Sequence, residues 1–318
     1  MSTKSDVLTI LTNNDDYVSG DKIARELKVS RNAVWKAVKE LQSEGINIDS
    51  AKKRGYKLCH AELPNKEIIS TLCGDGVNVI VFDEVDSTNT VAKSLAEQGA
   101  SEWTVVIASR QTGGRGRLGR SFFSPDGTGL YMSIILRPRV GVDAALNITA
   151  SAAVAVTRAI EKLTDKMALI KWVNDVFVDN KKVCGILTEA SFNMEDSSME
   201  YAVLGVGVNL SMPKSGFPDD ISNIAGDIGL DISMRDAFIA QIIKEFMYLY
   251  NGLHQKLFYE EYKAKQMLIG KSVNVIKAGS VNGAVVEALD DECRLVVKYP
   301  DGTSEALYTG EVSVREAL

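Results

Sequence analysis

The sequence predicts an α+β protein built from three units. In its N-terminal part, apolar residues recur at the spacing of a helix, and two short runs of alternating apolar and polar residues follow. Its middle part contains several apolar segments typical of strands and one long apolar helix. Its last part consists of short alternating runs separated by turns. With 318 residues, 45% hydrophobic and 25% charged, the chain can form two or three ordered domains. We expect these domains at residues 1–62, 66–269 and 270–318.

Three helices are expected near the N-terminus, because apolar residues recur at helical spacing in residues 7–11, 23–27 and 34–41. Ser30 stands where it can cap the third helix, which we expect to begin at Arg31. Two alternating runs, residues 46–50 and 55–58, then predict a hairpin with a basic tip. A helix-turn-helix followed by such a hairpin is a winged helix.

The charge distribution indicates that DNA binding, if present, is local to this winged helix. The whole chain has a net charge of -6, which argues against nucleic-acid binding over its full surface. The first sixty residues hold eleven basic and eight acidic side chains, so they carry +3 and the remainder carries -9. In such a fold the third helix enters the major groove and the hairpin tip meets phosphate. The residues expected to contact DNA are Ser30, Arg31, Asn32, Trp35, Lys36, Lys39, Lys52, Lys53 and Arg54. A winged helix used for protein contacts or dimerisation is the alternative.

The middle of the chain begins after a linker, residues 61–65, in which Asn65 can cap a new helix. In the first half of this domain we expect strands at residues 77–85, 103–109 and 129–136, followed by a helix at residues 144–163. Between the first two strands, Ser87, Thr88 and Asn89 open a helix, and helix capping is the simplest role for at least one of their hydroxyls.

Residues 111–125 are the most informative stretch of the sequence. Arg115, Arg117 and Arg120 alternate there with three glycines, which predicts a mobile loop whose guanidinium and backbone N–H groups converge on an anion. A dinucleotide fold would place this glycine pattern at the start of a helix, but a turn follows it, and no Gly-Lys-Ser/Thr sequence ends it as in a P-loop. A solvated basic loop without a binding role is the alternative.

Three further motifs carry polar or glycine residues inside predicted strands. Residues 169–178 are expected to form one strand broken by the polar pair Asn174 and Asp175. Lys182 then begins an inner strand near Gly185, where it can meet phosphate or simply be a solvated edge residue. Gly205 and Gly207, before Asn209, allow a ligand to approach the backbone, or are ordinary glycines of a packed sheet. With only two histidines in the chain, histidine chemistry is not expected to carry the function.

The C-terminal part is expected to form a small barrel of short strands at residues 273–276, 283–289, 295–299 and 305–308. A turn at residues 300–302 separates the last two strands.

Taken in order, these motifs resemble the biotin protein ligases, specifically the bifunctional kind that doubles as a biotin operon repressor. The motifs are the winged helix, residues 86–89, 111–120, 171–175, 182–187 and 205–209, so the resemblance covers nearly the whole chain. It implies a class II synthetase-like central domain with a mixed sheet and an SH3-like C-terminal barrel. It also implies a reaction in which biotin and ATP give biotinoyl-5'-adenylate, whose acyl group passes to a lysine of a carrier domain.

The resemblance assigns roles to individual residues, with biotin as substrate and ATP and Mg²⁺ as cofactors. It implies that Lys182, Arg115 and Arg117 are catalytic. The residues implied to bind biotin are Ser87, Thr88, Asn89, Gln111, Gly114, Arg115, Arg117, Lys182, Gly185 and Gly205. The residues implied to bind the nucleotide are Arg117, Arg120, Phe122, Asn174, Asp175, Lys182, Asn209 and Arg315. Asp175 is also implied to bind the Mg²⁺ ion.

Three positions depart from the pattern of the family. Val173 stands where members often have proline, Phe122 stands where tryptophan faces adenine, and Leu118 replaces an arginine found in some members. An aromatic face therefore remains at Phe122, although a smaller one. The arginine-glycine motif with histidine of the related lipoate ligases is absent from the sequence.

The partners implied by the resemblance are a biotin carboxyl carrier protein, operator DNA upstream of biotin genes and a second copy of the chain when ligand is bound. No stretch has the length and apolarity of a membrane span or signal peptide, so a cytoplasmic location without membrane partners is expected. Two alternatives stay open: a ligase whose winged helix binds no DNA, and a biotin-sensing regulator without ligase activity.

Overall fold

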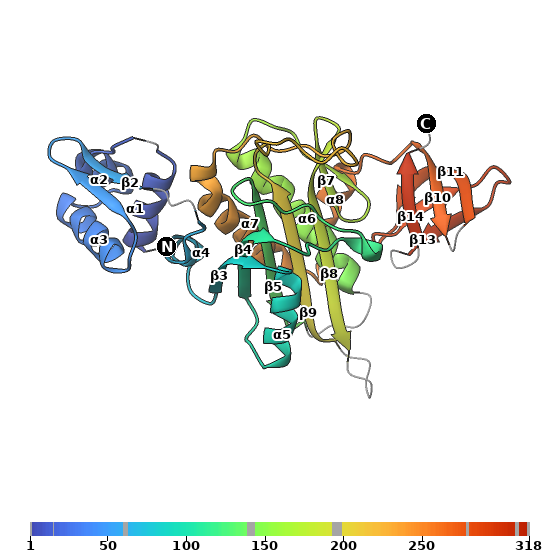
Figure 1. The fold of residues 1–318 in the computed structure, drawn as a ribbon, viewed down its shortest axis with the longest axis horizontal. Coiled ribbons are helices and arrows are strands. Elements are labelled where there is room, and N and C mark those ends of the chain that lie inside the picture. Colours follow the sequence, from blue (N-terminus) through green and yellow to red (C-terminus); the bar gives the residue numbers. More distant parts are fainter. Residues whose placement is uncertain are drawn as a thin grey trace.

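The computed structural model describes residues 2–14, 16–59, 63–138, 144–192, 199–277, 280–308 and 312–316. Three units follow one another along the long axis of the molecule (Figure 1): a small helical unit, a central sheet covered by helices, and a small C-terminal sheet. This arrangement confirms the predicted α+β fold of three units.

The N-terminal unit is the expected winged helix. It consists of α1 Thr3–Thr12, α2 Gly20–Leu27, α3 Arg31–Ser43, β1 Ile48–Ala51 and β2 Gly55–Leu58. Ser30 caps α3, because its hydroxyl accepts a hydrogen bond from the backbone N–H of Ala33 at 3.1 Å. The buried residues of α1 to α3 form one apolar core together with Ile46, Ile48 and Leu58. Residues 52–54 form the turn of the β1–β2 hairpin, which is the predicted wing.

A short helix joins this unit to the central sheet. Asn65 caps α4 Lys66–Cys73 through a hydrogen bond that its side-chain oxygen accepts from Ile68 N at 3.0 Å, as predicted. Ile68 and Leu72 of α4 pack into the core of the winged helix, whereas Ile69 packs into the core of the central domain. The buried carboxylate of Asp236 also accepts a hydrogen bond from Asn65 N at 3.2 Å. The junction is therefore packed on both sides, and residues 61 and 62 lie outside the described part.

The central unit is a seven-stranded mixed sheet in the order β3-β4-β5-β9-β8-β7-β6. Its strands are β3 Asn78–Val85, β4 Thr104–Gln111, β5 Gly129–Leu136, β6 Leu169–Lys171, β7 Asp175–Val178, β8 Lys181–Phe192 and β9 Met199–Asn209. The pair β3 and β4 is parallel, and every other neighbouring pair is antiparallel. The arginine-glycine segment of residues 111–125, called the basic loop below, joins the neighbouring strands β4 and β5.

Helices cover both faces of this sheet (Figure 1), and the alternation of strand residues explains why. Val105 and Ile107 of β4 belong to the main core, which also contains α6 Ala144–Leu163 and α7 Arg235–Asn251. Val106, between them, points to the other face and packs against Ala92 and Ala96 of α5 Thr88–Glu97. The remaining helical segments are α8 Tyr259–Ala264 and the short turns η1 Arg117–Gly119 and η2 Ile232–Met234.

The expectation of one interrupted strand at residues 169–178 was wrong. The chain reverses at residues 172–174, and β6 and β7 pair antiparallel with each other, with Lys171 opposite Asp175. The polar residues Asn174 and Asp175 therefore lie at a turn and at the start of β7. Lys182 lies near the start of β8, an inner strand between β7 and β9, as predicted.

The C-terminal unit is a five-stranded antiparallel sheet of the SH3-like type in the order β13-β12-β11-β10-β14. Its strands are β10 Ser272–Lys277, β11 Ser280–Leu289, β12 Leu295–Lys298, β13 Ser304–Leu307 and β14 Val312–Glu316. The first four confirm the predicted runs, and β14 is an additional edge strand that pairs with β10.

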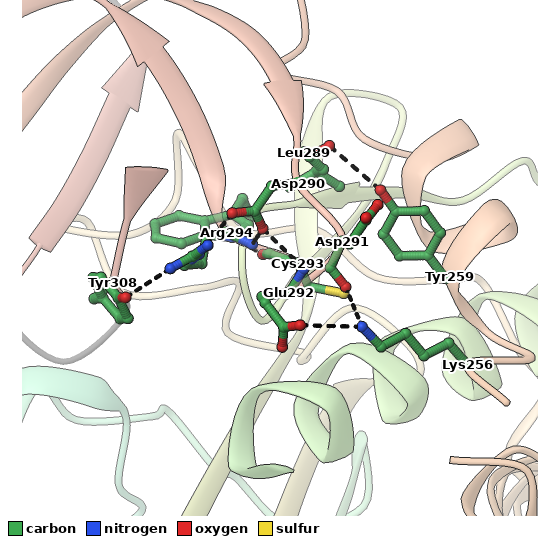
Figure 2. A network of polar contacts seen from close by, with 10 residues as sticks. Lys256, Tyr259, Leu289, Asp290, Asp291, Glu292, Cys293, Arg294 and Tyr308 are labelled. Carbon is green, nitrogen blue, oxygen red and sulfur yellow. Dashed lines mark hydrogen bonds and ion pairs between the residues drawn. The ribbon is translucent and has the colours of Figure 1, made fainter. Parts of the chain in front are cut away.

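The turn between β11 and β12 fastens this unit to the central domain (Figure 2). Asp290 holds the turn together by accepting hydrogen bonds from the backbone and side chain of Arg294, at 2.8 and 2.6 Å. Lys256 donates to the carbonyl of Asp291 at 2.5 Å, across the junction. The carbonyl of Cys293 accepts a hydrogen bond at 2.9 Å from the indole N–H of Trp172, which belongs to the β6–β7 turn. This last contact ties the C-terminal unit to the segment that carries Asn174.

Replacing Trp172 with phenylalanine is expected to lower the free energy of unfolding by about 2–4 kcal/mol. Trp172 is 6% exposed, so the change leaves a cavity and a buried carbonyl without its donor. Tyr308→Phe is a matched control, because it removes a 2.6 Å hydrogen bond to Arg294 from the same network at a side chain that is 63% exposed. Urea unfolding of both variants measures the difference. Equal stabilities of the two variants would show that the Trp172 contact does not fasten the units.

Candidate functional site

A cavity of about 660 Å³ opens where the basic loop crosses the central sheet, and its size is typical of small-molecule sites. Strands β8 and β9, the start of α5, the β6–β7 turn and the basic loop all contribute to its walls. The predicted site residues that line it are Ser87, Thr88, Asn89, Gln111, Arg115, Arg117, Arg120, Phe122, Asn174, Asp175, Lys182, Gly185 and Gly205. Motifs spread over more than a hundred residues of sequence thus meet in one place.

One end of the cavity is lined by uncharged polar groups. The backbone N–H of Thr88 donates to Gln111 Oε1 at 2.8 Å, and the hydroxyl of Thr88 lies 3.1 Å from the same oxygen. Gln111 Nε2 in turn donates to Ser124 Oγ at 2.9 Å, so the amide orientation of Gln111 is set at both ends. Ser87 occupies the N-cap position of α5, yet its hydroxyl makes no capping hydrogen bond. The capping role is therefore wrong for Ser87, which is one of the residues that line the cavity.

A buried polar network lies behind this end of the cavity. The Ser133 hydroxyl is fully buried and lies 2.6 Å from Asn89 Oδ1 and 2.8 Å from Thr88 Oγ1. Asn89 Nδ2 donates to the carboxylate of Glu189 at 2.8 Å, and Lys93 Nζ pairs with that carboxylate at 2.5 Å. Burial raises the pKa of Glu189, but the hydrogen bonds from Lys93 and Asn89 and the neighbouring charges outweigh it, so the net pKa is lowered. Glu189 is therefore a carboxylate at neutral pH.

Three glycines of β8 and β9 make room for side chains that face the cavity. A Cβ atom at Gly205 would lie 2.2 Å from Asn89 Oδ1, and one at Gly207 would lie 2.6 Å from the ring of Phe122. At Gly185 the Phe122 ring would be 3.1 Å away. The Phe122 ring therefore rests on bare backbone of both strands. A Cβ at Gly207 is incompatible with this position of the ring, whereas a Cβ at Gly185 would require the ring to move by a few tenths of an ångström.

The basic loop forms a compact turn over the cavity. Phe122 N donates to the carbonyl of Gly114 at 2.9 Å, and Gly116 N donates to that of Arg120 at 2.7 Å. Arg117 Nη1 donates to Asn174 Oδ1 at 3.1 Å. Burial lowers the pKa of Arg117, and the charge of Asp175 offsets part of that effect, so the guanidinium keeps its positive charge. The predicted mobility of this loop stays a prediction.

Lys182 is held in place at both its side chain and its backbone. Its Nζ lies 2.7 Å from Asp175 Oδ1, an ion pair that is poorly directed for a hydrogen bond. Its backbone N–H donates to the carbonyl of Ile224 at 2.7 Å, and its carbonyl accepts from Gly226 N at 2.9 Å. Lys182 thus lines the same cavity as a second lysine, Lys171, and the three arginines of the loop, Arg115, Arg117 and Arg120.

Two predicted site residues, Gly114 and Asn209, do not line the cavity. Gly114 belongs to the loop and packs closely against Phe122, because a Cβ at Gly114 would lie 2.3 Å from the Phe122 carbonyl oxygen. The Asn209 amide donates to the carbonyl of Gly226 at 2.8 Å, and so supports the segment that holds Lys182. The backbone of Arg315 belongs to β14, but its side chain is outside what the structure describes.

Several cavity or network residues were not predicted from the sequence. Lys171, Trp172, Phe177 and Ile224 line the cavity, whereas Ser133 and Glu189 form the network behind it. The only sequence signal for Ser133 is a hydroxyl in the otherwise apolar run of residues 129–136. Glu189 lies in a strand that continues past the Lys182 motif, and no spacing connects it with Asn89.

Sequence comparisons place the whole chain in one family. The Biotin/lipoate A/B protein ligase family matches residues 81–209, an HTH domain matches residues 3–57, and the biotin protein ligase C terminal domain matches residues 268–315. The bifunctional ligase/repressor BirA of Bacillus subtilis is 32% identical over 317 residues, covering 94% of each chain. This chain belongs to the biotin protein ligase family.

Other members of the biotin protein ligase family support the same placement. The bifunctional ligase/repressor BirA of Escherichia coli is 27% identical over 322 residues, covering 98% of this chain and 97% of the relative. The biotin protein ligase from Aquifex aeolicus in complex with biotin and ATP superposes with a TM-score of 0.63 at 27% identity, covering 76% of this chain and 99% of that one. No helix in the described part of this ligase family member is long and apolar enough to cross a membrane.

Proposed function

We propose that the chain is an ATP-dependent, AMP-forming biotin protein ligase and also a biotin-responsive repressor of biotin genes. The observation that carries the ligase function is the cavity itself. It joins an uncharged polar end, suited to a cyclic urea, to a wall of cationic side chains suited to a carboxylate and phosphates. Biotin and ATP are the ligands that the solved relative from Aquifex aeolicus holds.

The reaction has two steps whose demands match these residues. In the first, a carboxylate oxygen of biotin attacks the α-phosphorus of ATP, and the bond to pyrophosphate breaks. In the second, the amine of an acceptor lysine on a carrier domain attacks the acyl carbon, and AMP leaves. Because anions approach each other in the first step, positioning and charge stabilisation supply most of the catalysis. We assign that role to Lys182, Arg115 and Arg117.

The binding roles follow the two ends of the cavity. We propose that Ser87, Thr88 and Gln111 bind the urea ring, with Asn89 and Gly205 beneath them and Gly114 and Gly185 shaping the walls. We propose that Phe122 offers its ring to the adenine and that Arg120, Asn174 and Asp175 meet the phosphates. Asn209 supports this end through Gly226, and Arg315 is proposed to reach the nucleotide from the C-terminal unit.

Asp175 is the proposed residue for Mg²⁺. Among the described residues no cluster of three or more His, Cys, Asp or Glu side chains is arranged for a metal. One carboxylate nevertheless fits Mg²⁺ in nucleotide sites, where phosphates and water complete the coordination. Asp175 Oδ1 is buried and pairs with Lys182 Nζ at 2.7 Å, so the carboxylate lies beside the cationic groups proposed to meet the phosphates. The metal would neutralise phosphate charge, while Lys182 and the arginines hold the reacting oxygens.

Transfer to an acceptor tests the ligase function. The protein, biotin, ATP and Mg²⁺ are mixed with a biotin carboxyl carrier domain, and the mass of the carrier is measured. We expect one biotinoyl group on its acceptor lysine, dependent on ATP. If the adenylate forms but the carrier stays unmodified, the protein does not transfer biotin, and the alternative of a biotin-sensing regulator without ligase activity would hold.

The repressor function is carried by the exposed surface of the winged helix. Trp35 on α3 is 49% exposed, and Arg31, Asn32, Lys36, Lys39 and the wing residues Lys52 and Lys53 are exposed as well. Arg54 pairs with Asp16 at 3.0 Å and lies over the Tyr17 ring, so its guanidinium is partly held at the base of the wing. Ser30 caps α3 and thereby sets where the recognition helix begins. Since one winged helix contacts few phosphates, we propose that two copies bind a palindromic operator when ligand promotes dimerisation.

Replacing Lys52, Lys53 and Arg54 with alanine is expected to weaken DNA binding and to flatten its salt dependence by a slope of about two to three. These side chains supply the cationic tip of the wing, and no cavity residue lies among them. A gel shift on DNA upstream of biotin genes, repeated over a range of salt concentrations, measures the slope. Carrier biotinylation by the same variant is the control and should be unchanged. DNA binding with an unaltered slope would assign the winged helix another role.

A further inference from the structure

An exposed ion pair joins the two helices of the helix-turn-helix. Asp21, in the first turn of α2, pairs with Arg31, the first residue of α3, with 3.0 Å between Oδ1 and Nε. Arg25, one turn further along α2, donates from its own Nε to the backbone carbonyl of Asp21 at 3.3 Å. Together with Ala24 and Val29, these three residues line a hollow between α2 and α3.

Both contacts use Nε and so engage one side of each guanidinium group. The terminal nitrogens Nη1 and Nη2 carry the remaining N–H groups of an arginine, and this pair of nitrogens can bind O6 and N7 of a guanine together. A carboxylate at Nε therefore restricts the rotation of the Arg31 guanidinium without using all the donors that read a base.

Arg31 stands where a helix-turn-helix reads base edges. Residues at the N-terminus of the recognition helix meet base edges in the major groove, while the preceding helix crosses the phosphate backbone. The side chain of Arg31 is 74% exposed, and Trp35, one turn further along α3, is 49% exposed. Arg25 on α2 is exposed as well. This placement favours a base contact for Arg31 and a phosphate contact for Arg25.

Asp21 is the unexpected member of this group, because a carboxylate close to DNA opposes the binding of every sequence. Its ion pair with Arg31 is exposed on both sides, and such pairs contribute only about 0–1 kcal/mol to the stability of a fold. A carboxylate that holds Arg31 does, however, keep the guanidinium from turning to a neighbouring phosphate. It thereby lowers affinity for all DNA and increases discrimination between sequences.

We infer that Asp21 orients the Arg31 guanidinium toward one guanine in each half of the operator and is thus a residue that determines DNA specificity. Arg31 contacts the base, and Asp21 acts through Arg31 as a positioning residue. Arg25 binds a phosphate beside the same base pair. The inference rests on the proposed repressor function and is independent of the ligase function.

Selection from a library of random DNA duplexes tests the inference. Wild-type protein with biotin, ATP and Mg²⁺ selects a duplex, and gel shifts then measure binding after each guanine of one half-site is replaced in turn by adenine, with its partner changed to thymine. We expect one guanine whose replacement weakens binding by about ten- to a hundredfold. Arg31→Lys keeps the charge but loses the planar group, so it should lose most of this preference and keep the salt dependence.

Asp21→Ala separates orientation from simple charge. The preference for the same guanine should fall by about three- to tenfold, while affinity for an unselected duplex rises because a negative charge has been removed. Glu26→Ala is the matched control. Glu26 is also an exposed carboxylate of α2, but it does not line the hollow, so its loss should leave the preference as in wild type.

The outcomes distinguish this inference from the functions on which it does or does not depend. Reduced preference in both Arg31→Lys and Asp21→Ala, with the wild-type preference in Glu26→Ala, supports it. If Asp21→Ala raises the affinity for selected and unselected duplexes equally, the carboxylate is only a repelling charge and the inference is overturned. An unchanged preference in Arg31→Lys overturns it as well, while repression stands. A wild-type protein that selects no sequence overturns the repressor function together with this inference.

Discussion

Lys182→Ala should slow the formation of adenylate by about a hundredfold or more, the scale of one lost charge-stabilising donor. Lys182 lines the cavity and its ammonium pairs with Asp175, while its backbone is hydrogen-bonded to the segment around Ile224. Because the charge acts on the reacting oxygens, biotin affinity should fall less than the rate. Biotin-dependent release of pyrophosphate, measured in a single turnover, reports the rate directly.

Lys181→Ala is the control for this variant. Lys181 is the preceding residue of β8, and its ammonium donates to the carbonyl of Asn223 rather than lining the cavity. Its loss should leave pyrophosphate release near the wild-type rate. A Lys182→Ala protein that melts normally and releases pyrophosphate as fast as wild type would remove Lys182 from the chemistry.

Alanine at Gly205 and at Gly207 should damage two different functions, each by about ten- to hundredfold, since overpacking costs about 1–3 kcal/mol. At Gly205 the new Cβ would meet Asn89 Oδ1 at 2.2 Å, inside the buried polar network. At Gly207 it would meet the Phe122 ring at 2.6 Å. We therefore expect Gly205→Ala to weaken biotin binding and Gly207→Ala to weaken ATP binding.

Gly283→Ala serves as the matched substitution. Gly283 is also a strand glycine, in β11, but no heavy atom lies within 4 Å of the position of its Cβ. Separate titrations with biotin and with ATP measure the three variants. The assignment of the two ends of the cavity would be wrong if Gly205→Ala affected ATP alone or Gly207→Ala affected biotin alone.

The sequence was sufficient for elements whose signals are local. Ser30 and Asn65 each precede an apolar helical run, and both cap the helix that follows. The arginine-glycine loop was predicted from its alternating arginines and glycines and from the strongly apolar runs on either side of it. These features depend on neighbours within a few residues, so a single sequence reveals them.

Features that arise only from tertiary contacts were missed. The segment of residues 169–178 is apolar on both sides of Asn174, and such a run does not reveal that the chain reverses at Val173. No expectation was formed for α7, whose Phe238 packs in the central core while Ala240 packs against the winged helix. A helix buried on more than one side lacks a clear amphipathic pattern.

The same limit applies to the site. Ser133 lies 44 residues from Asn89 in sequence, and Glu189 lies 100 residues from it, yet hydrogen bonds join all three. Asn89 is ordinary near the start of a helix, and Ser133 and Glu189 are ordinary in strands, when each is seen alone. Only the pairing of β5, β9 and β8 brings them together, so the network could not be read from spacing.

The central claim is that one cavity of this chain joins biotin to ATP, and native mass spectrometry of the protein tests it most directly. The protein is incubated with biotin, ATP and Mg²⁺, without any carrier, and the mass of the complex is measured. We predict that the protein retains one molecule of biotinoyl-5'-adenylate, and that Lys182→Ala retains biotin with little or no adenylate. A wild-type protein that carries biotin and ATP side by side, without forming the adenylate, would contradict the account.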